Sequence, residues 1–356
     1  MKKLNIYLLK EFLSFFFGAL ILFVILITVA EISSRLSTYT QNMHNIKYFL
    51  SYHIFKMPFY TYYIFPIALM FSSTYVLGTF VKNKEMIAVE NSGISLFKFS
   101  TPIFIIVIFL CTSLVFFWEF VAAPLNKKAF DINDFIKGKG QSEFSGDWTL
   151  FGADNYVYFL EDYSYKDKYM INAIILKLRD DGGIEMRISS PKVQWVQEED
   201  KWYVTKGTLT KFTENKEISV EKITNYPLDV KEKERHFIPT PPLDSMSLSY
   251  EYKFIKLRKE INMATLKYET DFHYRISYCF SGFIIVMLAS LFSKFSTQSV
   301  LVVSLVLVIL VALFYYSVVM IFRSMGEAGN INAFIAAWVP NIIFSIFCIL
   351  AFKKFH

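Results

Sequence analysis

The sequence predicts a membrane protein of mixed α+β class, in which a bundle of six transmembrane helices (3+3) carries one inserted β-jellyroll-like domain. Two observations predict this class. Charged side chains crowd into residues 119–275, which hold 50 of the 68 in the chain, whereas the other 199 residues hold 18. The charge-poor parts contain long apolar runs, and the charge-rich middle contains short alternating runs. A soluble domain is about 25% charged throughout, so this uneven distribution excludes a single soluble domain.

Six uncharged runs are long enough to cross a bilayer. A hydrocarbon core about 30 Å thick requires roughly 20 apolar residues in a helix, and a helix satisfies its own backbone hydrogen bonds in lipid. The runs cover residues 12–30, 57–81, 99–118, 276–293, 295–322 and 330–352. A polar turn at 293–298, which contains Lys294, separates the fourth run from the fifth. We therefore expect six spans, with both ends of the chain on one side.

The distribution of Lys and Arg over the short loops predicts the orientation. Nine of these residues lie on the side of the two termini and four on the other side. Cytoplasmic loops carry an excess of Lys and Arg. We therefore expect both termini in the cytoplasm and the long polar insert outside.

The polar insert has the period-two pattern of strands from about residue 140. Strands are expected at 155–160, 173–178, 185–188, 192–197, 201–205 and 207–212, with Asp181-Gly182 as a hairpin turn. Short strands at such spacing favour a sandwich or jelly roll-like sheet. A proline-rich stretch at 239–242 marks a boundary, and 247–274 has the composition of a helix that leads into the fourth span. The expected domains are 1–123, 124–268 and 269–356.

Motifs for catalysis are absent from the sequence. It contains no Gly-x4-Gly-Lys-Ser/Thr phosphate loop, no Gly-x-Ser-x-Gly elbow and no metal-ligand cluster. The apolar runs lack the ionisable residues on which ion-coupled carriers usually depend. We therefore expect a non-catalytic subunit with no cofactor and no metal, which would take any energy for transport from a separate ATPase.

One segment between the second and third spans could contact such an ATPase. Met86, Val89 and Ile94 recur at near-helical spacing, Glu85 falls in the first turn, and Gly93 is a good helix stop. These features predict a short amphipathic helix at about 83–97. An interfacial loop helix without a partner explains the same pattern, so the residues alone leave both interpretations open.

At this segment the sequence resembles the lipopolysaccharide-export permeases of the LptF/LptG type. Residues 84–95 resemble the coupling-helix pattern of that family, and 57–66, with Met-Pro and Phe-Pro pairs, resemble its second span. Residues 269–275 resemble its Glu-x-His-x-Arg entry to the fourth span, and 329–341 its last span. The order of three helices, external β domain and three helices also fits, with a slight preference for LptG.

The resemblance implies a multi-pass permease of the bacterial inner membrane with a periplasmic β domain. Such permeases pair, usually as heterodimers, and recruit two copies of a cytoplasmic ABC ATPase. The complex extracts lipopolysaccharide and passes it to periplasmic jellyroll bridge proteins of the LptC/LptA type on the way to the outer membrane.

The resemblance also implies two sets of site residues. The ATPase-coupling set is Glu85, Met86, Val89, Glu90 and Gly93. The lipid-binding or gate set, on the first and fifth spans and the loop after the first, is Glu31, Arg35, Lys47, Tyr316 and Arg323. An Arg fork suits a dianionic lipid phosphate.

Two positions depart from the family pattern. Glu90 stands where a neutral or basic residue is common, and Glu31 replaces one lysine of a basic cluster. A less phosphorylated glycolipid or a lipoprotein-like cargo is therefore an alternative to lipopolysaccharide. The other functional alternatives are a permease of the lipoprotein-release type and a membrane-anchored periplasmic binding or scaffold protein.

Overall fold

The computed structural model describes residues 2–35, 46–136, 148–164, 167–213, 216–237, 242–260, 263–293 and 300–354. The chain divides into two compact units. A helical unit contains residues 1–132, 242–251 and 266–356, and a sheet unit contains 133–241 and 252–265. Residues 294–298 of the turn predicted at 293–298, and residues 239–241 of the proline-rich stretch, lie outside the described residues.

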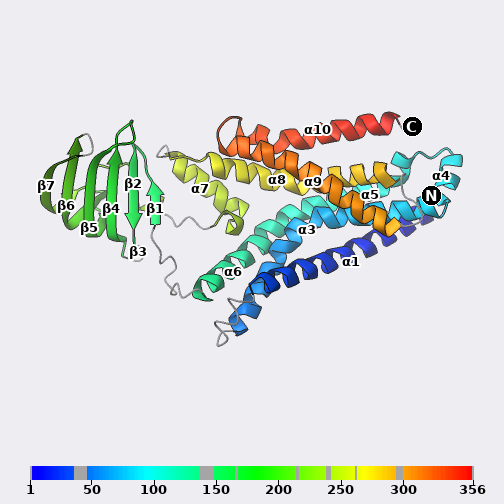
Figure 1. Cartoon of the computed structure of the whole chain (residues 1–356), viewed down its shortest axis with the longest axis horizontal. Coiled ribbons are helices and arrows are strands. Elements are labelled where there is room, and N and C mark those ends of the chain that lie inside the picture. Colours follow the sequence, from blue (N-terminus) through cyan, green and yellow to red (C-terminus); the bar gives the residue numbers. More distant parts are fainter. Residues whose placement is uncertain are drawn as a thin grey trace. The chain divides into compact units, whose positions relative to one another are not determined.

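Within the described residues, six helices are long and apolar enough to cross a membrane, as predicted. They are built from α1 (Lys2–Ser34), α3 (Ile46–Lys82), α5 (Leu96–Phe117), α8 (Leu266–Phe292), α9 (Val300–Glu327) and α10 (Ala333–Lys354). The third span runs on from α5 through the π-helical turn η2 (Trp118–Ala122) into α6 (Ala123–Ile136). The start of α1 and the end of α10 lie at one end of the unit, beside the short helix α4 (Glu85–Asn91) (Figure 1). We call this the α4 end.

Helices α3 and α8 form the centre of the helical unit. They are the most buried of the six, whereas α1 and α9 expose most of their apolar side chains. Gly282 of α8 permits close packing, since a Cβ there would lie 2.9 Å from Leu69 Cδ1 and 3.1 Å from Cys111 Sγ. The Tyr62 hydroxyl also donates to the carbonyl oxygen of Arg275 (3.0 Å). Helices α3, α5 and α8 therefore form a tightly packed core, and the more exposed helices pack around it.

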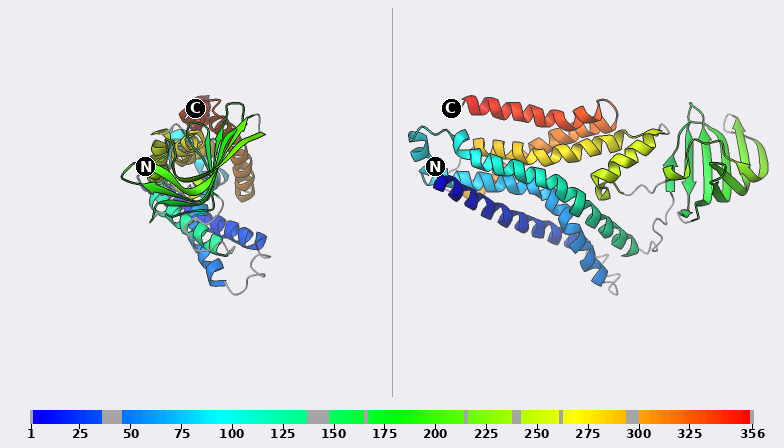
Figure 2. Two further views of the ribbon diagram at one scale, coloured as in Figure 1. Left: turned by 90° about the vertical axis from the view of Figure 1, so that its left-hand side faces the viewer. Right: turned by 180° about the vertical axis from the view of Figure 1, so that it is seen from behind.

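The sheet unit is one antiparallel sheet of seven strands. They are β1 (Trp148–Phe151), β2 (Tyr156–Leu160), β3 (Asp162–Ser164), β4 (Tyr169–Leu178), β5 (Ile184–Val196), β6 (Lys201–Thr213) and β7 (Lys216–Pro227). Their order is β1-β2-β4-β5-β6-β7, with β3 also paired to β4. Figure 2 shows the twist of this sheet. The predicted α+β membrane class is confirmed, and the described strands pair largely in chain order.

Several boundaries differ from the sequence prediction. The four runs predicted at 185–188, 192–197, 201–205 and 207–212 form only two strands, β5 and β6, because irregularities near Ser189 and Lys192 bend the ladder without ending it. The expected hairpin is confirmed, with the Arg179 N–H donating to the Gly183 carbonyl (2.8 Å). Strands β1, β3 and β7 were missed. The helix predicted at 247–274 is two helices, α7 (Leu248–Glu260) and α8.

The segment after β7, residues 228–237, closes one side of the sheet. We call this segment the strap. The buried carboxylate of Glu232 accepts hydrogen bonds from the Ala153 N–H and from the Tyr158 hydroxyl. The Glu232 carbonyl oxygen accepts from the Trp202 indole N–H (2.9 Å). Buried donors are costly to leave unpaired, so this one residue fixes the strap to β2 and β6.

Replacing Glu232 with alanine should lower the free energy of unfolding of the sheet unit by about 2–4 kcal/mol, because two buried donors lose their acceptor. Hydrogen exchange of β2 and β6 in the full chain measures this change. Glu185→Ala is the matched control, since its carboxylate lies at the surface beside Lys177 (3.1 Å) and surface ion pairs contribute little. Equal protection in the two variants would show that the strap does not depend on Glu232.

Candidate functional site

Helix α4 is a short connecting helix between α3 and α5. It begins after Lys84, whose φ of 60° lies in the left-handed region, and it ends before Gly93, whose φ is 74°. The Gly93 N–H donates to the Glu90 carbonyl (2.9 Å), and the Ile94 N–H to the Val89 carbonyl (3.3 Å). A β-carbon is strained in this region, so glycine at 93 allows the chain to turn directly into α5.

The faces of α4 separate the predicted coupling residues. Met86 is buried, and Val89 is partly buried against the core of the helical unit. Glu85 and Glu90 are exposed. Ile87 is also 53% exposed. The helix is therefore anchored by two apolar side chains and presents two carboxylates and one isoleucine outward.

At the opposite end of the helical unit, Glu31 of α1 is the centre of a charge cluster with α3. Its Oε1 lies 2.9 Å from Lys56 Nζ and 3.2 Å from an Arg35 guanidinium nitrogen. The Tyr52 hydroxyl donates to the same oxygen (3.0 Å), and the His53 ring lies 3.9 Å from Oε2. Glu31 thus faces both cations, where the family pattern led us to expect a lysine.

The other predicted gate residues lie apart from this cluster. Lys47 is exposed at the start of α3. Tyr316 of α9 is half-buried, and its ring stacks on Tyr278 of α8 with centroids 5.9 Å apart. Arg323 donates to Asp271 of α8 (2.7 Å). The structure therefore brings Glu31 and Arg35 together and places Tyr316 and Arg323 against α8 instead.

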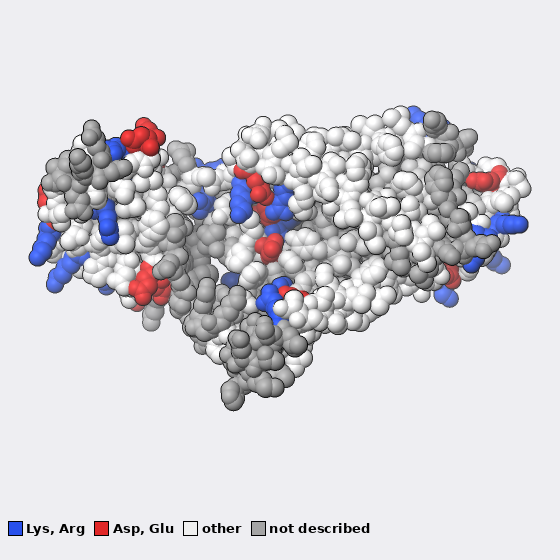
Figure 3. All heavy atoms as spheres, viewed as in Figure 1, with Lys and Arg blue, Asp and Glu red and all other residues white. Residues whose placement is uncertain are grey.

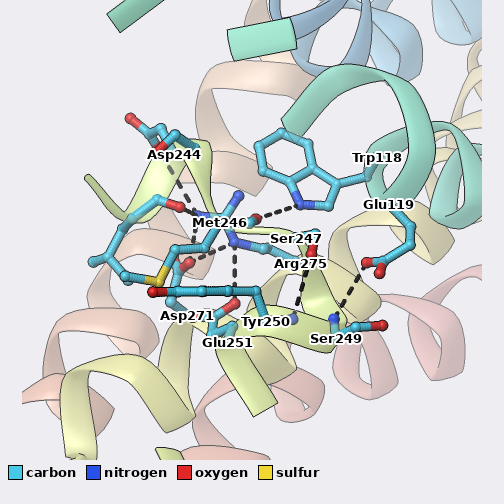
Figure 4. A network of polar contacts seen from close by, with 12 residues as sticks. Trp118, Glu119, Asp244, Met246, Ser247, Ser249, Tyr250, Glu251, Asp271 and Arg275 are labelled. Carbon is cyan, nitrogen blue, oxygen red and sulfur yellow. Dashed lines mark hydrogen bonds and ion pairs between the residues drawn. The ribbon is translucent and has the colours of Figure 1, made fainter. Parts of the chain in front are cut away.

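Arg323 belongs to a buried network of charges that the sequence prediction missed. Figure 4 shows the part of this network around Arg275. At its centre is Arg275 of α8, 2% exposed, whose guanidinium contacts Asp271 one turn earlier at 2.5 Å. The carboxylate of Glu251, at the start of α7, lies 3.6 Å from Arg275 Nε. The Leu243 carbonyl oxygen accepts from the same guanidinium at 2.9 Å.

Aromatic rings cover this network. The Arg275 guanidinium lies 4.3 Å from the centre of the Trp118 ring, and Arg323 lies 4.5 Å from that of Tyr274. The Trp118 indole N–H donates to the Met246 carbonyl oxygen (3.2 Å). The segment from Leu243 to Glu251 is thereby joined to η2 and α8 through Arg275 and Trp118.

Glu251 is a strongly perturbed titratable group outside the spanning helices. It is fully buried, and burial, together with the nearby Asp271 carboxylate, raises the pKa of its carboxyl group to about 9. The carboxyl group is therefore protonated at neutral pH. In Figure 3 the acidic and basic side chains visible on this face of the helical unit gather toward its two ends, and the stretch between them is largely uncharged.

A sequence signal for this network existed. Asp271 and Arg275 carry opposite charges at i and i+4, which places them on one helix face, and both precede an apolar run directly. We counted the fourth span from residue 276, so the two fell outside it. The structure begins α8 ten residues earlier, at Leu266.

A comparison with protein-family models decides the class of the protein. The model of the lipopolysaccharide export system permease LptF/LptG matches residues 6–354. The chain belongs to the LptF/LptG family. A comparison with curated proteins found no match.

Membership of the LptF/LptG family gives the broad function. The family is the permease component of the lipopolysaccharide export system, so this chain is a transport permease with six apolar spans. The family match does not separate LptF from LptG, and the slight preference for LptG stays a prediction. So do the roles of the two residue sets.

The Glu251 carboxyl group should make stability depend on pH. Between the unfolded pKa of about 4.5 and the folded pKa of about 9, the folded state holds a proton that the unfolded state has lost. The free energy of unfolding should therefore fall as pH rises through this window. Thermal unfolding of the full chain in detergent from pH 5 to 9 measures this. In Glu251→Gln the fall should be smaller, with a higher melting temperature than wild type at pH 9; unchanged curves would contradict the assignment.

Proposed function

We propose that this chain is one permease half of an ABC complex that extracts lipopolysaccharide, or a related glycolipid, from the inner membrane. The observation that carries the proposal is the family match across residues 6–354. The six spans and the inserted antiparallel sheet support it. In this proposal a paralogous permease pairs with the chain, two copies of a cytoplasmic ABC ATPase supply the energy, and periplasmic jellyroll bridge proteins of the LptC/LptA type receive the lipid.

The proposed orientation puts the α4 end in the cytoplasm and the sheet unit in the periplasm. Both described ends of the chain lie at the α4 end (Figures 1 and 2). The positive-inside rule favours the cytoplasm for this end, since nine of the thirteen Lys and Arg residues outside 119–275 belong to it. Helix α4 would then lie where an ATPase can reach it.

In this proposal the exposed face of α4 engages the ATPase. Glu85 and Glu90 would interact with its polar residues, and Ile87 would enter an apolar groove, as in other helix-in-groove contacts. Met86 and Val89 would transmit the force to the helical core, because they pack against it. Gly93 would keep the connection between α4 and α5 short, so that a displacement of α4 is transmitted directly to α5.

The gate would lie along α1 and α9. Both helices expose large apolar side chains, such as Leu22 and Leu26 on α1 and Leu313 and Phe314 on α9. These faces suit contact with lipid or with the partner permease. Arg35, at the end of α1, and Lys56, ten residues into α3, would meet the lipid headgroup, with Lys47 as a further cation. Because Glu31 already faces both Arg35 and Lys56, the proposed headgroup carries fewer phosphates than one met by a cluster of free cations.

Coupling can be tested in the complex with the ATPase. Glu85→Ala should retain the fold, since the side chain is exposed and, among the described residues, accepts a hydrogen bond from the Asn83 side chain (3.1 Å). Gly93→Leu should weaken coupling by straining the turn at φ 74°. Both should lower ATP-driven lipid release by about tenfold or more, equivalent to the loss of a charge-assisted contact. Glu11→Ala on α1 is the control. Full lipid release by both coupling variants would show that α4 does not transmit the ATPase stroke.

Glu31→Gln tests the gate. Removal of this carboxylate takes away the negative charge beside Arg35 and Lys56, and a surface Coulomb term of about 1 kcal/mol corresponds to roughly fivefold tighter binding of a phosphorylated headgroup. Competition by a bisphosphorylated lipid A against a photoreactive lipid, measured on the full chain, gives the change. Glu11→Gln on the same helix should leave it unaltered. Weaker binding by Glu31→Gln would mean that the carboxylate, and not the cations, recognises the cargo.

A further inference from the structure

A partly open pocket of about 600 Å³ lies at the α4 end, far along α1 from the charge cluster at Glu31. It is formed by the start of α1, the turn after α4 and the first half of α5, and its eleven lining residues include Leu4, Ile94, Lys98 and Phe109. The pocket shares helix α1 with Glu31. Asn5, in the lining, and Glu31 are 26 residues apart, so the two places are separated by roughly 39 Å along the helix.

The residues that line the pocket change from polar to apolar along α5. Lys98 and Thr101 line one end, and Ile105, Ile106 and Phe109 line the other. From Lys98 to Phe109 the helix rises eleven steps of about 1.5 Å, or about 16 Å. This length is close to half of a hydrocarbon core about 30 Å thick. The pocket therefore has the length and polarity of one membrane leaflet.

The charge at its polar end is a single cation. Lys98 is exposed, and among the described residues the structure shows no ion pair for its ammonium group. None of the lining residues is acidic. A lysine at the level of the headgroups attracts an anionic lipid, and the apolar residues behind it can receive an acyl chain.

We propose that this pocket is a binding site for an anionic glycerophospholipid, separate from the site of the transported lipid. Its phosphate pairs with Lys98, and one acyl chain lies between α1 and α5 toward Phe109. The volume falls in the range of small-molecule sites. A helix about 10 Å wide needs about 420 Å³ for each turn, so the pocket volume encloses less than two turns and is too small to bury a helix along its length of about 16 Å. Ile94 lines the pocket directly after α4, which brings the bound lipid next to the coupling helix.

The test uses the purified full chain in detergent and phosphatidylglycerol with a photoreactive acyl chain. We expect crosslinks on Ile105, Ile106 and Phe109, and competition by unlabelled phosphatidylglycerol but not by phosphatidylcholine. Lys98→Gln should reduce labelling by about fivefold, the effect of one basic residue near a charged surface. Thr101→Trp, which fills the pocket without removing a charge, should reduce it at least as much.

Lys82→Gln is the matched control, because Lys82 is an exposed lysine at the same end of the helical unit but outside the pocket. It should label like the wild type. Equal competition by phosphatidylcholine, or labelling that survives in Thr101→Trp, would overturn the proposal. So would the finding that a photocrosslinker at position 101 captures a subunit of the assembled complex instead of lipid.

Discussion

The geometry of the helical unit depends on the ion pair between Asp271 and Arg275. Both side chains are 2% exposed, and each charge alone would be costly to bury. Together they form a pair at 2.5 Å, and a second arginine, Arg323, balances the acid from α9. Buried pairs of this kind add little net stability, but the loss of one partner is severe. The network therefore determines which helices pack together at this end, and it contributes little to the net stability of their packing.

The same network includes the chain segment that follows the sheet unit in sequence, residues 242–251. The carbonyl oxygens of Leu243 and Met246 accept hydrogen bonds from Arg275 and Trp118. Glu251, at the start of α7, joins the same network. Since Glu251 is neutral at pH 7, the network holds two acidic groups near Arg275 without two negative charges. Protonation of Glu251 thus lowers its repulsion with the Asp271 carboxylate.

Large-scale features of the fold were predictable from sequence because they rest on composition. The six spans follow from apolar runs, and the hairpin at Asp181-Gly182 follows from local turn chemistry. Strand ends were harder to predict. The pattern of β5 breaks near Ser189 and Lys192, where the ladder is irregular, and a break in alternation looks like a turn in sequence. Strand β7 (Lys216–Pro227) carries several lysines and glutamates, so its apolar alternation was too weak to recognise.

The candidate sites also divide into features that the local sequence predicts and features that depend on tertiary packing. Helix α4 could be predicted because its anchors, Met86 and Val89, and its stop, Gly93, lie within a few residues of one another. The partners of Glu31 could not, because Lys56 comes from a different helix, 25 residues later. The contacts of Arg323 on α8 lie far away in the sequence, since Asp271 is 52 residues earlier and Tyr274 is 49 residues earlier. Local patterns therefore located single residues with functional chemistry, and only tertiary packing showed which charges neutralise one another. This distinction matters most at Arg35, which the sequence presents as a free cation and the structure places against Glu31. In the proposed function, the attraction of Arg35 for a lipid phosphate would therefore be weakened by the Glu31 carboxylate, which lies 3.2 Å away.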